Sequence, residues 1–219
     1  DLDKGLFLLR GAMGVDFSDY KRTSSRRRLA RRMAVHRLSA LHDYVQLLRD
    51  DPAEARALFD DLLIHVTSFF RDPETFDSLA ERALPEILQQ KRRGGTIRVW
   101  CAGCSTGEEA YSLVITIREF LARENASDIP IQLFATDISD KAIAAARAGV
   151  YSDAAVREVG ADRLARYFAR LDGGGYQIAK SIRERCAFVK HDLAADPPFS
   201  KLDLVSCRNV LIYFDPELQ

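Results

Sequence analysis

The stretch Arg98-Val-Trp-Cys-Ala-Gly-Cys-Ser-Thr-Gly-Glu-Glu-Ala-Tyr-Ser-Leu-Val-Ile115 decides the fold, because it predicts a strand, a tight loop and the start of a helix in direct succession. β-Branched and aromatic residues open it. Its middle, Cys101 to Gly107, has only small side chains, so a ligand can approach the backbone closely. Glu108 and Glu109 then begin a helix with an apolar face. We expect a polar ligand at this loop, although an ordinary α/β turn has the same pattern.

A second strand is expected at residues 131–137, and it ends in Asp137, 30 residues after Gly107. A carboxylate at the tip of the second strand of a β-α-β unit is placed to accept two hydrogen bonds from a ribose. The loop lacks the Gly-x-Gly-x-x-Gly spacing of dinucleotide sites, and two glutamates stand where a pyrophosphate would lie. A cofactor with a ribose and a positive charge but no phosphate fits better, and S-adenosylmethionine has these properties.

The pair Cys101-x-x-Cys104 invites a zinc or dithiol interpretation. Zinc needs a second pair of ligands at suitable spacing, and neither Cys186 nor Cys207 has a Cys or His close enough to form one. We therefore expect no metal, and we assign both thiols of the pair to packing of the small-residue loop.

Composition restricts the class of protein. The 219 residues are 47% hydrophobic and carry no net charge, which suits one large or two small globular domains. The sequence has no run of 18 apolar residues and no signal-peptide pattern, so we expect neither membrane insertion nor secretion, and a cytoplasmic location.

Two domains are expected. Residues 1–66 have apolar positions at helical spacing and predict a small all-helical domain. Residues 67–219 predict an α/β domain with four core strands, around Ile97, Ile131, Ala187 and Leu202. Residues 150–185 interrupt the β-α-β order, with a helix expected over residues 162–171 and a strand from Tyr176.

A basic segment lies between Tyr20 and His42, with eight Lys or Arg residues and no acidic one. Because the whole chain is neutral, the remainder is acidic. Arg28, Arg31 and Arg32 fall on one side of a helix at i, i+3 and i+4, so they could form a positive stripe that docks an acidic protein or nucleic acid. A solvated helix face has the same pattern.

The segment His65-Val-Thr-Ser-Phe-Phe-Arg-Asp-Pro73 connects the two predicted domains. We expect its two phenylalanines to pack at the domain junction and Asp72 to cap the next helix. Thr67 and Arg71 flank the aromatic pair, which would place a hydroxyl and a guanidinium near a cleft between the domains.

Taken together, these residues resemble the CheR family, the chemotaxis-receptor glutamate methyltransferases that use S-adenosylmethionine. The resemblance covers nearly the whole chain and is closest to members fused to other signalling modules. Five motifs in the family's order carry it: Arg26-Arg-Arg-Leu-Ala-Arg-Arg-Met33, Val66-Thr-Ser-Phe-Phe-Arg71, Ser105-Thr-Gly-Glu-Glu109, Ala135-Thr-Asp-Ile138 and Cys207-Arg-Asn-Val-Leu-Ile-Tyr-Phe214.

The resemblance implies an α/β fold of the class I S-adenosylmethionine-dependent methyltransferases, with a Rossmann-like sheet, an inserted β subdomain at about residues 150–185 and a preceding all-helical domain that helps to hold the receptor. His65 stands where the family often has asparagine. Whether the β subdomain binds a receptor tail peptide stays open. The cofactor site is expected to be lined by the loop glycine Gly103 and by the residues that the resemblance implies. These are Thr67, Arg71, Glu109, Asp137, Asp192, Leu193, Asn209 and Val210.

The implied reaction transfers a methyl group from S-adenosylmethionine to glutamate side chains of chemoreceptors, giving methyl esters and S-adenosylhomocysteine. A glutamate is already an anion at pH 7, so attack on a sulfonium methyl needs alignment and desolvation but no general base. We expect Arg71 and Tyr213 to orient the reacting carboxylate. The expected partner is the cytoplasmic helical domain of methyl-accepting chemoreceptors, or a similar signalling protein, and not nucleic acid.

Two other functions stay open. An RNA methyltransferase would use the same fold, and Asp196-Pro-Pro-Phe199 has the composition of a motif that holds flipped bases. That motif precedes a strand here instead of ending one, so we interpret it as a loop. A non-catalytic module that binds S-adenosylmethionine and signals is the second alternative.

The C-terminal part of the sheet is expected to be truncated. The fold class implies seven strands, whereas four core strands are predicted and the helix that begins at Pro216 has only four residues before the sequence stops. Leu204 and Val205 would then lie on an exposed sheet edge. We expect the chain to be a fragment that is less stable and less active than a longer one.

Overall fold

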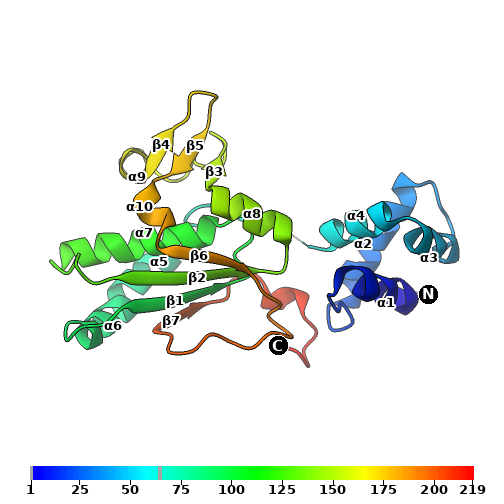
Figure 1. Ribbon diagram of the computed structural model, residues 1–219, viewed down its shortest axis with the longest axis horizontal. Coiled ribbons are helices and arrows are strands. Elements are labelled where there is room, and N and C mark those ends of the chain that lie inside the picture. The colour runs from blue at the N-terminus through cyan, green and yellow to red at the C-terminus, as the bar shows by residue number, and fades with distance from the viewer. Residues whose placement is uncertain (1, 64–65) are drawn as a thin grey trace. The chain divides into compact units, whose positions relative to one another are not determined.

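Residues 2–63 and 66–219 are described by the computed structural model, and their contacts divide them into two units (Figure 1). The first unit contains residues 2–63 together with residues 209–219, and the second contains residues 66–208. The sequence predicts that residues 209–219 belong with the second domain, whereas in the structure they pack with the N-terminal helices.

Helices form most of the first unit. Its described helices are α1 (Leu2–Met13), α2 (Arg22–Val35), α3 (Leu41–Asp50) and α4 (Pro52–Leu62). Local capping begins α4, because the Asp51 carboxylate accepts a hydrogen bond from the Ala53 N–H and Pro52 occupies a first-turn position that needs no N–H donor. The apolar faces of these helices meet in a core that includes Leu9, Leu29, Tyr44 and Leu58.

Backbone hydrogen bonds attach the C-terminal segment to this unit. The Lys21 N–H donates to the Tyr213 carbonyl at 2.9 Å, and the Asp215 N–H donates to the Asp19 carbonyl at 2.8 Å. The rings of Tyr20 and Phe214 pack edge to face, with centroids 5.0 Å apart. These contacts explain why the short 3-10 helix η2 (Leu211–Tyr213) belongs to the first unit rather than to the sheet.

A parallel sheet in the order β6-β2-β1-β7 forms the centre of the second unit. Its strands are β1 (Ile97–Ala102), β2 (Ile131–Asp137), β6 (Cys186–Lys190) and β7 (Leu204–Ser206). The four predicted core strands are therefore confirmed, although β7 is short and begins two residues after the predicted position at Leu202. It lies at the edge of the described sheet, and Val205 is 53% exposed, as predicted.

One face of the sheet carries the main core. Helix α7 (Glu108–Arg123) begins as predicted, and in α8 (Asp140–Ala148) Ser139 caps the start and Gly149 ends the helix at a φ of 60°. Helix α5 (Pro73–Ser78), the π-helical segment η1 (Leu79–Ala83) and α6 (Leu84–Lys91) add to this side. Among the described helices, none is both long enough and apolar enough to cross a membrane.

Aromatic side chains from a loop cover part of the opposite face. Phe199 stacks on Phe134 with centroids 4.7 Å apart and also contacts Trp100. The Trp100 Nε1 donates to the Thr136 hydroxyl at 2.9 Å. The segment that contains Asp196-Pro-Pro-Phe199 is a loop, as predicted, and here it packs on the sheet.

An antiparallel sheet lies inside residues 150–185, in the order β3-β5-β4 (Figure 1). The predicted helix over residues 162–171 is wrong in its second half, because α9 ends at Tyr167 and Phe168 pairs with Ile178 in extended conformation. Strand pairing overrides the local helical pattern at this point. The elements here are β3 (Val150–Tyr151), α9 (Ala161–Tyr167), β4 (Phe168–Arg170), β5 (Tyr176–Ile178) and α10 (Lys180–Arg183).

Candidate cofactor site

The strand order of the parallel sheet reverses between β1 and β7. From β1 the chain moves through β2 to β6 on one side, while β7 pairs with β1 on the other side. In open α/β sheets, ligands bind outside the carboxyl ends of the strands where the strand order reverses. Gly103 and Asp192 follow the ends of β1 and β6, Asp137 is the last residue of β2, and Glu109 lies in the first turn of the helix after β1.

The loop between β1 and α7 is tightly packed. Ser105 adopts a left-handed φ of 49°, and Gly103 and Gly107 have φ values of 69° and 98°. A Cβ atom at Gly107 would lie 2.9 Å from the Ala146 Cβ in α8, so only glycine fits there. The small residues therefore let the loop turn sharply against α8 and begin α7.

Asp137 binds the loop to the tip of β2. Its Oδ2 accepts the Ser105 N–H at 2.8 Å, and its Oδ1 accepts the Ser139 N–H at 2.9 Å. Each carboxylate oxygen has two lone pairs, so each can accept a further bond from a ribose hydroxyl. The structural role of Asp137 in holding the loop was not predicted from its strand-tip position.

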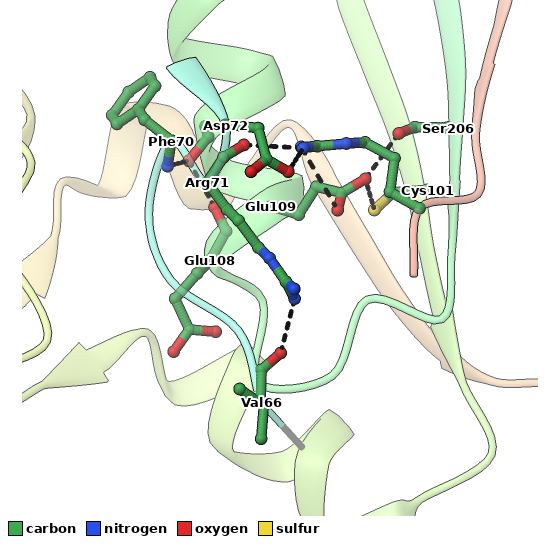
Figure 2. Close-up of polar contacts among 10 residues, drawn as sticks. Val66, Phe70, Arg71, Asp72, Cys101, Glu108, Glu109 and Ser206 are labelled. Carbon is green, nitrogen blue, oxygen red and sulfur yellow. Dashed lines mark hydrogen bonds and ion pairs between the residues drawn. The ribbon is translucent and has the colours of Figure 1, made fainter. Parts of the chain in front are cut away.

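Two acidic side chains begin α7, and each has a different environment (Figure 2). The Glu109 Oε1 accepts a 2.6 Å hydrogen bond from the Ser206 hydroxyl, and its Oε2 lies 3.9 Å from the Arg208 Nη1. Glu108 is buried, and this burial raises its pKa, opposed in part by the 2.7 Å hydrogen bond from the Thr106 hydroxyl. The first turn of α7 therefore gives the loop an acidic character.

The Arg71 segment runs beside this first turn (Figure 2). The Phe70 N–H donates to the Ser112 hydroxyl at 3.0 Å, and the same hydroxyl donates to the Glu108 carbonyl at 2.7 Å. The Arg71 guanidinium donates to the Val66 carbonyl at 3.1 Å. Ser112 thus fixes the segment on α7, and Thr67 is half-buried within it.

Arg208 holds the same segment from the sheet side. Its Nη2 donates to the Arg71 carbonyl at 2.8 Å and to the Asp72 Oδ2 at 2.7 Å. The predicted helix cap at Asp72 is wrong, because its backbone is left-handed and no side-chain capping bond forms. The carboxylate pairs with Arg208 instead.

The sequence predicts that the aromatic pair of this segment packs at a domain junction. In the structure the pair packs inside the second unit instead. Phe69 makes edge contacts with Tyr151 and Phe168, with centroids 4.8 and 5.3 Å apart. The Tyr151 hydroxyl donates to the Thr106 carbonyl at 2.7 Å. The inserted residues are therefore attached directly to the loop.

The remaining predicted site residues are distributed between the two units. Asp192 and Leu193 are half-buried just beyond β6, where the Asp192 Oδ1 accepts the Ala194 N–H at 2.9 Å. Asn209, Val210 and Tyr213 belong to the C-terminal segment of the first unit. His65 lies outside the described residues.

The predicted positive stripe is only partly a surface feature. The Arg32 guanidinium makes two hydrogen bonds to Glu54, and these side chains are only 18% and 3% exposed. The Arg28 Nε is buried and without a hydrogen-bond partner in the described part of the chain. Arg31 is 64% exposed and lies 3.9 Å from Asp61. Docking of a partner protein by these three arginines stays a proposal. Arg32 already pairs with Glu54 in its own unit.

The two loop cysteines are buried. Burial raises the pKa values of the Cys101 and Cys104 thiols well above the usual range, with nearby carboxylates adding to the effect. Within residues 2–63 and 66–219, no cluster of His, Cys, Asp and Glu is arranged to hold a metal ion.

Four polar residues at the site were not predicted as site residues. Ser112 has a signal in the sequence, since it is a polar residue in an apolar helical run, four positions after Glu108. The bonds made by the other three depend on long-range contacts that no local pattern shows. The four are Ser105, Ser112, Ser206 and Arg208.

The donor set fits S-adenosylmethionine. Asp137 has acceptor capacity for a ribose diol, and Glu108 and Glu109 supply carboxylates near the loop. These acidic groups suit a cofactor with a sulfonium and an ammonium group, and they would repel a pyrophosphate.

Comparisons with known proteins agree with this interpretation. Residues 65–219 match the family model described as "CheR methyltransferase, SAM binding domain", and residues 1–63 match "CheR methyltransferase, all-alpha domain". The chain is 34% identical, over 96% of its length, to "Chemotaxis protein methyltransferase 1" of Pseudomonas aeruginosa, of which it covers 78%. It is 32% identical, over 94% of its length, to a "Probable chemotaxis protein methyltransferase" of Rhizobium etli, of which it also covers 78%.

A third relative is much longer than this chain. It is the "Uncharacterized 104.1 kDa protein in hypE 3'region" of Rhodobacter capsulatus, which is 44% identical over 94% of the chain, while the chain spans only 21% of that protein. The parallel sheet, the small helical unit and both family models confirm the predicted fold class. The chain therefore belongs to the CheR family of S-adenosylmethionine-dependent methyltransferases.

Proposed function

We propose that this chain transfers a methyl group from S-adenosylmethionine to glutamate carboxylates in the cytoplasmic helical domain of chemoreceptors, or of a similar signalling protein. The products are glutamate methyl esters and S-adenosylhomocysteine. The observation that carries the proposal is the loop between β1 and α7, which Asp137 holds through the Ser105 N–H and which leads into Glu109 in the first turn of α7, in a chain whose relatives are named chemotaxis protein methyltransferases.

For this reaction the protein mainly has to position the cofactor and the substrate carboxylate. Bound S-adenosylmethionine supplies an electrophilic methyl group, and a glutamate side chain is already ionised at neutral pH. Asp137 and Glu109 would hold the cofactor, and Arg71 would orient the incoming carboxylate by a charge-assisted hydrogen bond. Ser112 and Arg208 fix the backbone on either side of Arg71, so its guanidinium starts from a defined position. Tyr213 is the second proposed orienting group.

Receptor docking is proposed for the basic helix α2. Arg31 offers a largely exposed guanidinium, and Arg26 and Arg27 are exposed on the same helix. An acidic helical partner would be attracted by these charges. A chemoreceptor substrate also implies that the enzyme acts in the cytoplasm, which stays part of this proposal.

The test uses labelled S-adenosylmethionine with either receptor cytoplasmic fragments or RNA. We expect label on the receptor fragment that is released by mild base, because methyl esters hydrolyse and methylated bases do not. A receptor fragment with its surface glutamates changed to alanine is the control and should stay unlabelled. Base-stable label on RNA would refute the proposal, and so would cofactor binding without any transfer.

A further inference from the structure

A second concave site lies far from the cofactor loop. It has a cavity volume of about 300 Å³ and is bordered by the C-terminal half of α7, the loop that leads into β2, the end of α9, and α10. Ile131, the first residue of β2, forms part of its wall, whereas Asp137 ends the same strand at the cofactor site. A strand rises ~3.3 Å per residue, so the two sites are separated by ~20 Å.

Three arginines line this cavity, and no Asp or Glu does. Arg118 comes from α7, Arg166 from α9, and Arg185 from the junction between α10 and β6. Within the described residues, neither Arg118 nor Arg166 forms an ion pair, in contrast to the neighbouring Arg163, which binds Glu119 through two nitrogens. The positive charge in the cavity is therefore not neutralised by the lining residues.

Arg118 and Arg185 repel each other when no ligand is bound. Burial lowers the pKa of Arg185, and repulsion from Arg118 lowers it further, while Glu184 acts in the opposite direction. Glu184 itself is exposed and lies 3.5 Å from Lys180. An anion between the guanidiniums would replace this repulsion with attraction and with paired hydrogen bonds.

The other lining groups suit a small phosphorylated ligand. Ser127 and Ser181 are among the lining residues, and Tyr167 contributes a largely buried side chain to the wall. The volume is at the lower end of the range of about 300–1,000 Å³ for small-molecule sites, so it favours a compact ligand over a nucleic-acid strand. We propose that Arg118, Arg166 and Arg185 form a binding site for a phosphate-bearing small molecule, separate from the cofactor site.

Calorimetry with inorganic pyrophosphate tests this site. The full chain is first saturated with S-adenosylhomocysteine, so that the cofactor site cannot contribute. We expect saturable binding of pyrophosphate at low ionic strength, weakened about tenfold or more by Arg118→Gln and by Arg185→Gln. Arg157→Gln removes the same charge from an exposed position outside the cavity and should leave the affinity unchanged. Absence of saturable binding, or an equal loss in Arg157→Gln, would overturn the proposal.

A second measurement needs no variant. Phenylglyoxal modifies accessible arginines, and mass spectrometry locates the modified residues. We expect pyrophosphate to protect Arg118 and Arg166 in the unaltered chain but not Arg157. Sedimentation with vesicles of anionic phospholipid separates the two sources of phosphate: Arg118-dependent binding to vesicles without binding of pyrophosphate would overturn the assignment to a free small molecule.

Discussion

At the scale of single residues, Asp137 holds the Ser105 and Ser139 N–H groups. In the proposed function its remaining lone pairs also accept the ribose of the cofactor. A substitution at this position is therefore expected to act on loop geometry and on ligand binding together. The effect on the fold has to be measured separately from the effect on affinity.

We expect Asp137→Ala to weaken S-adenosylmethionine binding by about 1.5–3 kcal/mol, since hydrogen bonds to a charged group are lost. It should also lower the melting temperature, because two backbone N–H groups lose their acceptor. Calorimetry and thermal melts measure the two effects. Asp140→Ala is the matched control, since this neighbouring acid is exposed and pairs with Lys190 at 2.9 Å. Unchanged affinity in a folded Asp137→Ala protein would contradict the ribose assignment.

Glu54 is the central acceptor of a buried cluster in the first unit. Besides its bonds from Arg32, it accepts a 2.6 Å hydrogen bond from the Tyr44 hydroxyl and lies 2.7 Å from the His36 Nε2. Burial raises its pKa, but the hydrogen bonds outweigh this effect, and the pKa falls from 4.5 to about 2. The charged form is therefore favoured in the folded protein.

The lowered pKa of Glu54 has a consequence for stability against pH. Between pH 4.5 and about 2 the unfolded chain binds a proton that the folded chain does not, so the contribution is fully present above pH 4.5 and is lost as the pH falls towards 2. We expect Glu54→Gln to lower the free energy of unfolding by about 3–5 kcal/mol at neutral pH, because it breaks a buried ion pair. Urea unfolding followed by circular dichroism should show this difference shrinking below pH 4.5. Asp43→Asn, at an exposed site on α3, should show no such pH-dependent difference.

At the scale of elements, α2 has two different faces. Ser25 and Leu29 are buried, and Arg32 continues this side of the helix towards Glu54. Arg26, Arg27 and Arg31 remain exposed. The same helix therefore contains arginines that stabilise the helical unit and arginines that are available to a partner.

We expect Arg31→Glu to raise the KM for a receptor fragment about two- to fivefold, as is typical of an exposed charge pair, and to leave the affinity for S-adenosylmethionine unchanged. The effect should shrink at high salt. Arg49→Glu, an exposed position on α3, is the control and should not change the KM. Arg32→Glu should instead destabilise the protein, because two carboxylates would then meet in the cluster. If Arg31→Glu leaves the KM for the receptor fragment unchanged at low salt, the exposed face of α2 does not bind the receptor.

At the scale of the whole molecule, one intrinsic probe reports on one unit. The chain has a single tryptophan, Trp100, and it lies in β1 of the second unit. Its fluorescence follows the unit that contains Glu109 and Asp137, whereas circular dichroism is dominated by the helices of both units. The two signals can therefore separate ligand effects on the sheet from general effects.

We expect S-adenosylhomocysteine to raise the free energy of unfolding seen by Trp100 fluorescence by about 2.7 kcal/mol at a concentration 100 times its Kd, because it binds only the folded unit. Methionine at the same concentration is the control and should have no effect. If calorimetry shows that S-adenosylhomocysteine binds but the unfolding midpoint seen by Trp100 fluorescence does not change, the ligand does not bind the unit that contains β1.

Local patterns predicted the elements around the cofactor loop well. The limits of β2 and the start of α7 follow from the β-forming residues at 131–137 and from the small-residue loop before Glu108, which act on neighbouring residues. The errors have one physical cause. Asp72 and the second half of the helix at residues 162–171 are each decided by partners outside their own local pattern, Arg208 for the first and strand β5 for the second.

The fold class, the family, the cofactor, the helix start that contains Glu109 and the strand tip at Asp137 could be predicted from the sequence, because they follow from propensity, spacing and the order of motifs along the chain. Only the tertiary structure decided that Arg32 turns inward to Glu54, that Arg208 and Ser112 fix the Arg71 segment, and that Arg118, Arg166 and Arg185 line one cavity. These groups come from segments separated by tens of residues. Their hydrogen bonds and charges meet only when packing brings the segments together, so no pattern of neighbours along the chain can show them.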